Sequence, residues 1–111
     1  MNEKDILKKN YGPWGEIRKK DLYENRPAEW EIIEVAGNLD QYLEEYNDRL
    51  QVRADSMLDD MMKAAGVDES LKERDPMAWI GQTNAIKAQV HEILEREILM
   101  QDVKEGINGN G

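Results

Sequence analysis

The chain has 111 residues, of which 35% are charged, and it contains neither cysteine nor phenylalanine. This length suits a single domain, and the lack of cysteine excludes disulfides, thiolate metal sites and cysteine nucleophiles. The formal net charge of −9 disfavours direct binding of duplex DNA, and no apolar run approaches the ~18 residues of a membrane span, so we expect a cytoplasmic protein.

The chain begins with a polar segment that has no helical apolar pattern. We therefore predict a flexible N-terminus over residues 1–10. Gly12, Pro13 and Gly15 then indicate a turn, because glycine and proline interrupt regular structure. The turn leads into a first helix predicted at about residues 16–25.

A second helix is predicted at about residues 27–36. Pro27 suits its first position, where the missing N–H has no partner to lose. Gly37 would end the helix, because glycine accepts the positive φ of a C-terminal cap. The apolar face would consist of Trp30, Ile33 and either Ile32 or Val35.

A long third helix is predicted at about residues 39–65, with Asn38 as its cap and Gly66 after its end. Its apolar residues recur at spacings of three and four, which is the period of an amphipathic helix. These residues are Leu39, Tyr42, Leu43, Tyr46, Leu50, Ala54, Met57, Leu58, Met61 and Ala65.

A short helix at about 68–74 and a long one at about 76–101 complete the predicted elements. Asp75-Pro76 is a strong start signal for the long helix, with aspartate as cap and proline at the first position. The remaining residues, 103–111, are rich in glycine and asparagine, so we predict a disordered tail there.

These elements predict an all-α fold. We expect one helical domain over residues 11–102, a small bundle with two long antiparallel helices and two shorter N-terminal ones. A helix of ~26 residues is roughly 39 Å long. In a small bundle such a helix either has exposed ends or pairs with a second copy of the chain. A homodimer is therefore an alternative to the monomer.

Candidate catalytic and metal sites are few. His91 is the only histidine, and His91-Glu92 with Glu95 lacks the second histidine of a zinc hydrolase helix. Asp55, Asp59 and Asp60 offer too few oxygen ligands for a calcium or magnesium site. We therefore predict no metal, no cofactor and no enzymatic activity.

The negative charge is concentrated in the middle of the chain. Residues 24–60 hold eleven acidic residues and only three arginines, for a net charge of −8. Such a field attracts basic protein surfaces and repels nucleic acid. The predicted contact residues for a basic partner are Glu29, Glu31, Glu34, Asp40, Glu44, Glu45, Asp48, Asp55, Asp59 and Asp60.

A small basic cluster offers an alternative site. Arg18, Lys19 and Lys20 lie near Trp14 and Tyr23 and could contact phosphate groups of DNA. Three positive charges are a small footprint for a DNA-binding domain, and no recognition-helix pattern follows them. A solvated helix face is the competing interpretation.

Two groups of motifs, found within about residues 11–100, are distinctive. In the first half they include Tyr11-Gly12, Leu22-Tyr23-Glu24-Asn25-Arg26-Pro27 and Ala36-Gly37-Asn38-Leu39. In the second half they include Met62-Lys63-Ala64-Ala65-Gly66-Val67 and Asp75-Pro76-Met77-Ala78-Trp79-Ile80-Gly81. Together these motifs resemble the transposon-encoded TnpV family over about residues 11–100. The resemblance implies a protein of bacterial mobile elements and brings no catalytic residues with it.

The sequence thus favours a protein-binding regulator or inhibitor. Carboxylates held in rows on a stiff helix can imitate nucleic-acid charge and cover the basic groove of a nuclease, a transposase or another nucleic-acid-binding protein. For a mobile element, an anti-CRISPR-like role would fit. The alternative is a transposition accessory factor, acting with a transposase or on DNA through residues 18–20.

Overall fold

The computed structural model describes the backbone of residues 1–109 and the side chains of residues 1–100. Within that part of the chain every regular element is an α-helix and no strand is present, so the predicted all-α fold is confirmed. In chain order the helices are α1 (Glu3–Lys8), α2 (Pro13–Asn25), α3 (Pro27–Val35), α4 (Leu39–Ala64), α5 (Glu69–Arg74) and α6 (Pro76–Gly109).

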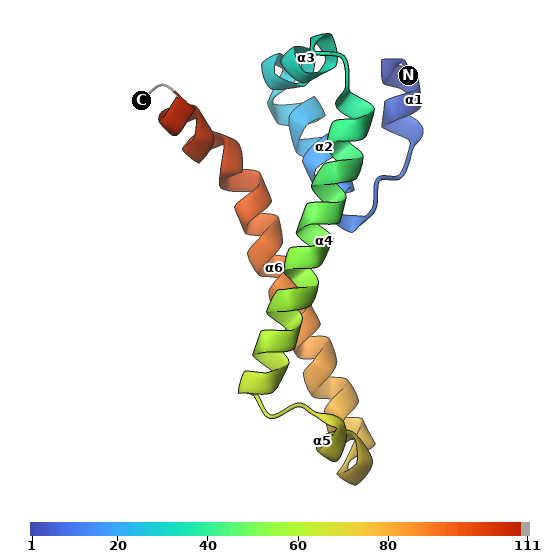
Figure 1. Cartoon of the computed structure of the whole chain (residues 1–111), viewed down its shortest axis with the longest axis vertical. Helices are drawn as coiled ribbons and strands as arrows, with labels where there is room; N and C mark the ends of the chain where they lie inside the picture. The colour runs from blue at the N-terminus through green and yellow to red at the C-terminus, as the bar shows by residue number, and fades with distance from the viewer. Residues whose placement is uncertain (110–111) are drawn as a thin grey trace.

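Two long antiparallel helices, α4 and α6, form the frame of the molecule (Figure 1). They lie together around the middle and diverge toward one end, where α2 packs against both of them. We call this the α3 end, because α3 lies beyond α2 there. The short helix α5 joins the two long helices at the opposite end, called the α5 end. The result is a long, thin molecule with extents of 55 × 35 × 19 Å.

The helix boundaries follow the local signals that the sequence contains. Proline occupies the first turn of α2 and α3 and the first residue of α6. Asp75 accepts a hydrogen bond from the backbone N–H of Ala78 at 3.1 Å, which confirms it as the cap of α6. Asn38 occupies the cap position of α4, but its side chain makes no capping bond and instead donates to Gln41.

Two helix starts differ from the prediction. Helix α2 begins at Pro13, so Gly15 lies inside it rather than in a turn. Helix α1 occupies residues for which no helix was predicted, with Asn2 accepting from the N–H of Asp5 at 2.9 Å. Ile6 is only 2% exposed there. One buried apolar side chain creates no periodic signal, so sequence patterning missed this helix.

The last helix is longer than predicted. The backbone of α6 continues to Gly109, beyond the expected end near residue 101. The predicted disordered tail of 103–111 therefore begins in a segment with helical backbone. Its side chains and residues 110–111 lie outside the described residues.

The core consists of two adjoining groups of buried side chains. At the α3 end one group brings together Ile6, Tyr11, Leu22, Trp30, Leu39 and Leu43. The other follows the seam between α4 and α6 and comprises Trp14, Tyr46, Ala54, Val67, Ile86, Val90, Leu94 and Ile98. Burying a side chain such as leucine contributes roughly 1.5–3 kcal/mol, so these groups hold the helices together.

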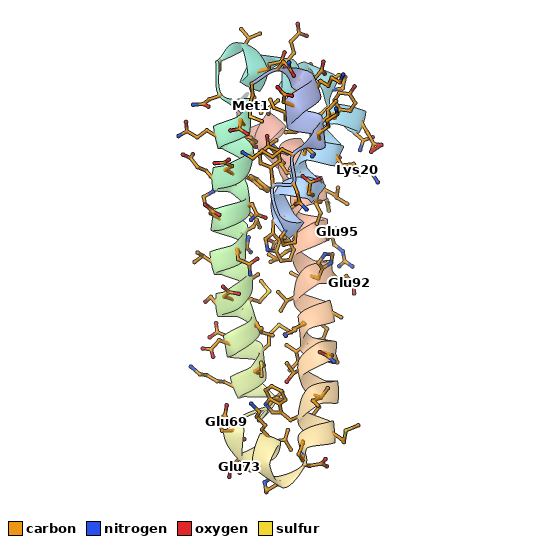
Figure 2. All side chains as sticks on the ribbon, turned by 90° about the vertical axis from the view of Figure 1, so that its right-hand side faces the viewer. Met1, Lys20, Glu69, Glu73, Glu92 and Glu95 are labelled. Carbon is orange, nitrogen blue, oxygen red and sulfur yellow. The ribbon has the colours of Figure 1, made fainter. Side chains whose placement is uncertain are left out.

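Packing is thinner at the α5 end. Only α4, α5 and the start of α6 meet there, and their side chains interdigitate in a single seam (Figure 2). Met57, Met61, Leu71 and Trp79 pack against the core but stay half-buried. No helix among the described residues combines the length and the hydropathy that crossing a membrane requires.

Candidate protein-binding surface

Five of the predicted acidic contact residues form a row along the outside of α4. Asp40, Glu44, Asp48, Asp55 and Asp59 are separated by four, four, seven and four residues, spacings that keep side chains on one side of a helix. The opposite side of α4 carries the buried core residues. The row covers 19 residue steps, or roughly 28 Å at about 1.5 Å per residue.

The first carboxylates of the row are bound to the N-terminal segment. The Lys9 ammonium forms ion pairs with Asp40, at 3.0 Å, and with Glu44. The Tyr11 hydroxyl donates to the same Asp40 oxygen at 2.7 Å. The Tyr11 hydrogen bond and the Lys9 charge together hold the pKa of Asp40 below its usual range. These two carboxylates therefore fasten residues 9–11 to α4, and their charge is partly compensated.

Farther along α4 the carboxylates face solvent. Asp55 accepts a hydrogen bond from Gln51 at 3.0 Å and Asp59 pairs with Lys63 at 3.0 Å, each on the same helix. Glu45 accepts from Gln41 at 2.7 Å, one turn away. Asp48 and Asp60 are exposed and form no side-chain hydrogen bond or ion pair among the described residues. Surface pairs of this kind are weak, so these carboxylates keep most of their negative charge.

The remaining predicted acidic residues lie on α3. Glu31 and Glu34 are exposed, one helical turn apart, and neither has a side-chain partner within the described part of the chain. Glu29 is half-buried and takes part in an interaction. Helix α3 contains three glutamates and no basic residue, so every charged side chain on it is negative.

The same helix answers a question that the sequence left open. Trp30 and Ile33 turn inward, as predicted, but both of the alternative third residues face solvent. Ile32 is 67% exposed and Val35 is 79% exposed. Two apolar side chains therefore stand among the free carboxylates of α3.

The structure corrects the alternative DNA-contact cluster. Arg18 and Lys19 are 3% and 6% exposed, so neither can reach a phosphate group. Arg18 donates to the Tyr42 hydroxyl at 2.8 Å and lies over the Tyr42 and Tyr46 rings. Apolar neighbours and side-chain partners from α4 bury this face of α2, which a linear charge pattern does not reveal.

Lys19 has a different internal partner. Its ammonium donates to the backbone carbonyl oxygens of Leu7 and Lys9, at 3.1 and 2.7 Å, and pairs with Glu16 at 2.9 Å. It thereby satisfies carbonyl groups at the end of α1, which explains why α1 docks on α2.

Of the basic cluster, only Lys20 remains exposed. It points outward from α2 (Figure 2), and the hollow beside it is lined by Asp21, Glu24 and Glu95. The negative charge of these carboxylates opposes phosphate binding. The structure therefore offers no DNA-binding cluster at residues 18–20.

The histidine, His91, lies on α6 with its side chain 51% exposed. Its ring is 5.3 Å from the Trp14 ring, and its Nδ1 is 3.9 Å from a Glu95 oxygen. Among the described residues no three histidine, aspartate or glutamate side chains converge as metal ligands. His91 thus serves as a packing partner of Trp14 in this structure.

Sequence reasoning missed two features of this surface. The first is the N-terminal clamp, formed by Lys9 and Tyr11 on Asp40. The second is a hollow beside α3 that is lined by Tyr23, Trp30 and glutamates. Both join residues far apart in the sequence, and the only local signal was the pair of aromatic residues near Pro27.

Comparison with known protein families identifies a relationship over most of the chain. The family model of the transposon-encoded protein TnpV matches residues 2–99. No curated protein and no solved structure matches the chain. The match extends from α1 through the described core of α6 and includes the acidic helices α3 and α4. The chain therefore belongs to the TnpV family of transposon-encoded proteins.

Proposed function

We propose that this transposon-encoded protein is a non-enzymatic regulator that binds a basic, nucleic-acid-binding protein through the acidic surface of α3 and α4. The observation that carries the proposal is the set of exposed carboxylates on these two adjacent helices. Glu31, Glu34, Asp48 and Asp60 form no side-chain hydrogen bond or ion pair among the described residues, so their charge is available to a ligand.

The rigidity of the frame supports this proposal. Helix α4 is anchored along one side by buried residues, so its outer carboxylates keep fixed spacings. Fixed charges of one sign raise the rate of association with a surface of opposite charge and select against nucleic acid. A protein that binds DNA or RNA presents such a basic surface.

The mobile-element origin narrows the proposed partners. A transposon interacts with its own transposase and with nucleases of its host, and both classes carry basic nucleic-acid channels. Inhibition of a host nuclease would make the protein anti-CRISPR-like, and binding to a transposase would make it an accessory factor. Both classes of partner act in the cytoplasm, so the proposal also places this protein there.

The test is affinity capture of the partner from lysate of a host that carries the element. We expect a nuclease or transposase to bind at low salt and to be released at high salt, because screening weakens contacts between exposed charges. The variant Asp48→Asn/Asp55→Asn/Asp60→Asn should lose most of the partner. Purified wild-type protein should bind no duplex DNA at physiological salt.

A control with the same charge change separates a specific surface from general acidity. Glu69→Gln/Glu73→Gln/Glu95→Gln removes three exposed carboxylates from α5 and α6 (Figure 2). We expect this variant to capture the partner as wild type does. If both triple variants lost the partner equally, net charge alone would explain the binding, and the proposed surface would be wrong.

A further inference from the structure

Helix α3 presents an apolar pair in the middle of a negative surface. At about 100° per residue, the order around the helix is Trp30, Glu34, Glu31, Val35 and Ile32. Val35 and Ile32 are thus neighbours, with the free carboxylate of Glu31 beside Val35 and that of Glu34 next to Glu31. Single exposed apolar residues are common on protein surfaces and do not by themselves indicate a binding site. This pair is informative because free carboxylates and a hollow lie next to it.

A hollow of about 270 Å³ adjoins this face. Two aromatic residues line it, Tyr23 and Trp30, whose rings meet edge to face with centroids 5.1 Å apart. Three glutamates, Glu3, Glu31 and Glu34, also line it together with a proline, and no basic residue does. The hollow therefore combines aromatic surface with carboxylates that lack a cation.

Trp30 supplies an independent sign of an incomplete site. The residue is 5% exposed, and its indole nitrogen has no hydrogen-bond acceptor in the described structure. Tryptophan N–H groups usually find a partner when they are buried. An acceptor brought by a ligand, together with a small shift of the ring, would satisfy this donor.

The chemistry of the hollow selects its ligand. Aromatic faces and carboxylates both attract an organic cation, and arginine or lysine side chains are the cations that proteins carry. A hard metal ion would need six or more oxygen ligands, which this lining does not offer. A peptide also has backbone carbonyl oxygens that can accept from the Trp30 indole, and apolar side chains that can cover Ile32 and Val35.

We propose that α3 and the hollow beside it form the docking site for a basic amphipathic segment of the partner protein. One arginine or lysine enters between Tyr23, Trp30 and the glutamates, while apolar residues of the segment lie on Ile32 and Val35. This inference rests on the proposed function and adds to it a docking site for one segment of the partner, while the α4 carboxylates contact the rest of the partner's basic surface.

The experiment uses the full chain and a short synthetic peptide of arginine and leucine at helical spacing. Binding is followed by NMR, with the indole N–H signal of Trp30 as reporter and those of Trp14 and Trp79 as internal references. We expect the Trp30 signal and the methyl signals of Ile32 and Val35 to shift on titration. The same peptide with glutamine in place of arginine should not bind.

Two pairs of variants locate the site. Glu31→Gln/Glu34→Gln should weaken peptide binding by ~10-fold, which corresponds to about 1.4 kcal/mol. Ile32→Ala/Val35→Ala should weaken it as well, with the charge unchanged. The matched control, Asp48→Asn/Asp60→Asn, removes two free carboxylates from α4 and should change the affinity by less than ~3-fold. All substitutions are at exposed positions, and circular dichroism checks that the variants fold.

The possible failures are distinguishable. If the α4 pair weakened binding and the α3 pair did not, docking on α3 would be wrong while the proposed function stood. A peptide that bound none of the proteins would overturn both proposals. If the Trp30 signal shifted on concentrating the protein without peptide, the face would bind a second copy, and a basic partner segment would be the wrong occupant.

Discussion

At the scale of single residues, the role of a charge depends on what surrounds it. Arg18, Lys19 and Asp21 are all buried and all bonded within the protein, Asp21 to Arg26 at 3.0 Å. Asp40 is half-buried and serves the N-terminal clamp. Only charges such as Asp48 and Glu31 are free for a partner. The charge available for recognition is therefore smaller and more localised than the net charge of −9 suggests.

The clamp makes a prediction about acid stability. Tyr11→Phe removes the hydroxyl that donates to Asp40 and should lower the free energy of unfolding at neutral pH by about 1–2 kcal/mol. Because the pKa of Asp40 is lowered in the folded protein, its contribution is complete above the ordinary value of 3.8 and is lost as the pH falls through the folded pKa. The difference between wild type and variant should therefore shrink below about pH 3.8.

Urea unfolding at neutral and acidic pH measures this difference. Tyr23→Phe is the control, since the Tyr23 side chain is exposed and its hydroxyl makes no hydrogen bond in the described structure. Its stability should stay within ~0.5 kcal/mol of wild type. A Tyr11→Phe effect that was constant across the pH range would contradict the assigned contact.

At the scale of elements, α2 is held against α4 by close backbone approach. Asn47 of α4 accepts from the backbone N–H groups of Trp14 and Gly15 at 2.9 and 3.0 Å, so one helix caps the start of the other. Gly15 permits this contact, because a Cβ atom there would lie 2.7 Å from Cβ of Tyr11 and 3.1 Å from the carbonyl oxygen of Leu43. Gly81 of α6, by contrast, has open space around it.

These two glycines give opposite predictions for the same substitution. Gly81→Ala should stabilise the protein by about 0.5–1 kcal/mol, because alanine restricts the unfolded chain and favours helix. Gly15→Ala should destabilise it by roughly 1–3 kcal/mol, because the added methyl group forces α2 away from α4. Chemical unfolding of both variants measures the difference. Equal effects of the two substitutions would show that the α2–α4 approach is looser than described.

At the scale of the whole molecule, packing is uneven from one end to the other. At the α3 end four helices and the N-terminal clamp enclose fully buried residues such as Leu22 and Leu43. At the α5 end one seam between two long helices, closed by α5, leaves Met57, Met61 and Trp79 half-buried. Local stability follows the amount of buried apolar contact, so the two ends should differ in stability.

Amide hydrogen exchange tests this difference. Amides of α4 at residues 57–64 and those of α5 should exchange on the order of tenfold or more faster than amides at residues 43–54. Uniform protection along α4 would contradict it. The length of the helices also allowed a homodimer, which predicts a different result. A second copy bound at the α5 end would slow amide exchange there, and only at high protein concentration.

The regular elements were largely predictable because their signals are local. Pro27 and Pro76 at helix starts, Asp75 as a cap and the long apolar stripe of α4 are such signals. The predicted bounds of α3, α4 and α5 and the predicted start of α6 lie within one residue of the observed ones, whereas the start of α2 and the end of α6 differ by several residues. Helix α1 was missed because its docking depends on Ile6 and on a distant lysine. The acidic candidates were found as a group, but the sequence could not tell the free carboxylates from those already paired.

The sequence by itself determined the all-α fold, the order of the helices and the concentration of negative charge in residues 24–60. Those features depend on propensity, periodicity and composition, which act over a few residues at a time. Only the tertiary structure decided that Arg18 and Lys19 are buried and that Ile32 and Val35 are exposed. It also decided that Asp40 belongs to the N-terminal clamp. Each of these depends on which helices pack together, and the free energy of burial is set by neighbours that lie far away in the chain.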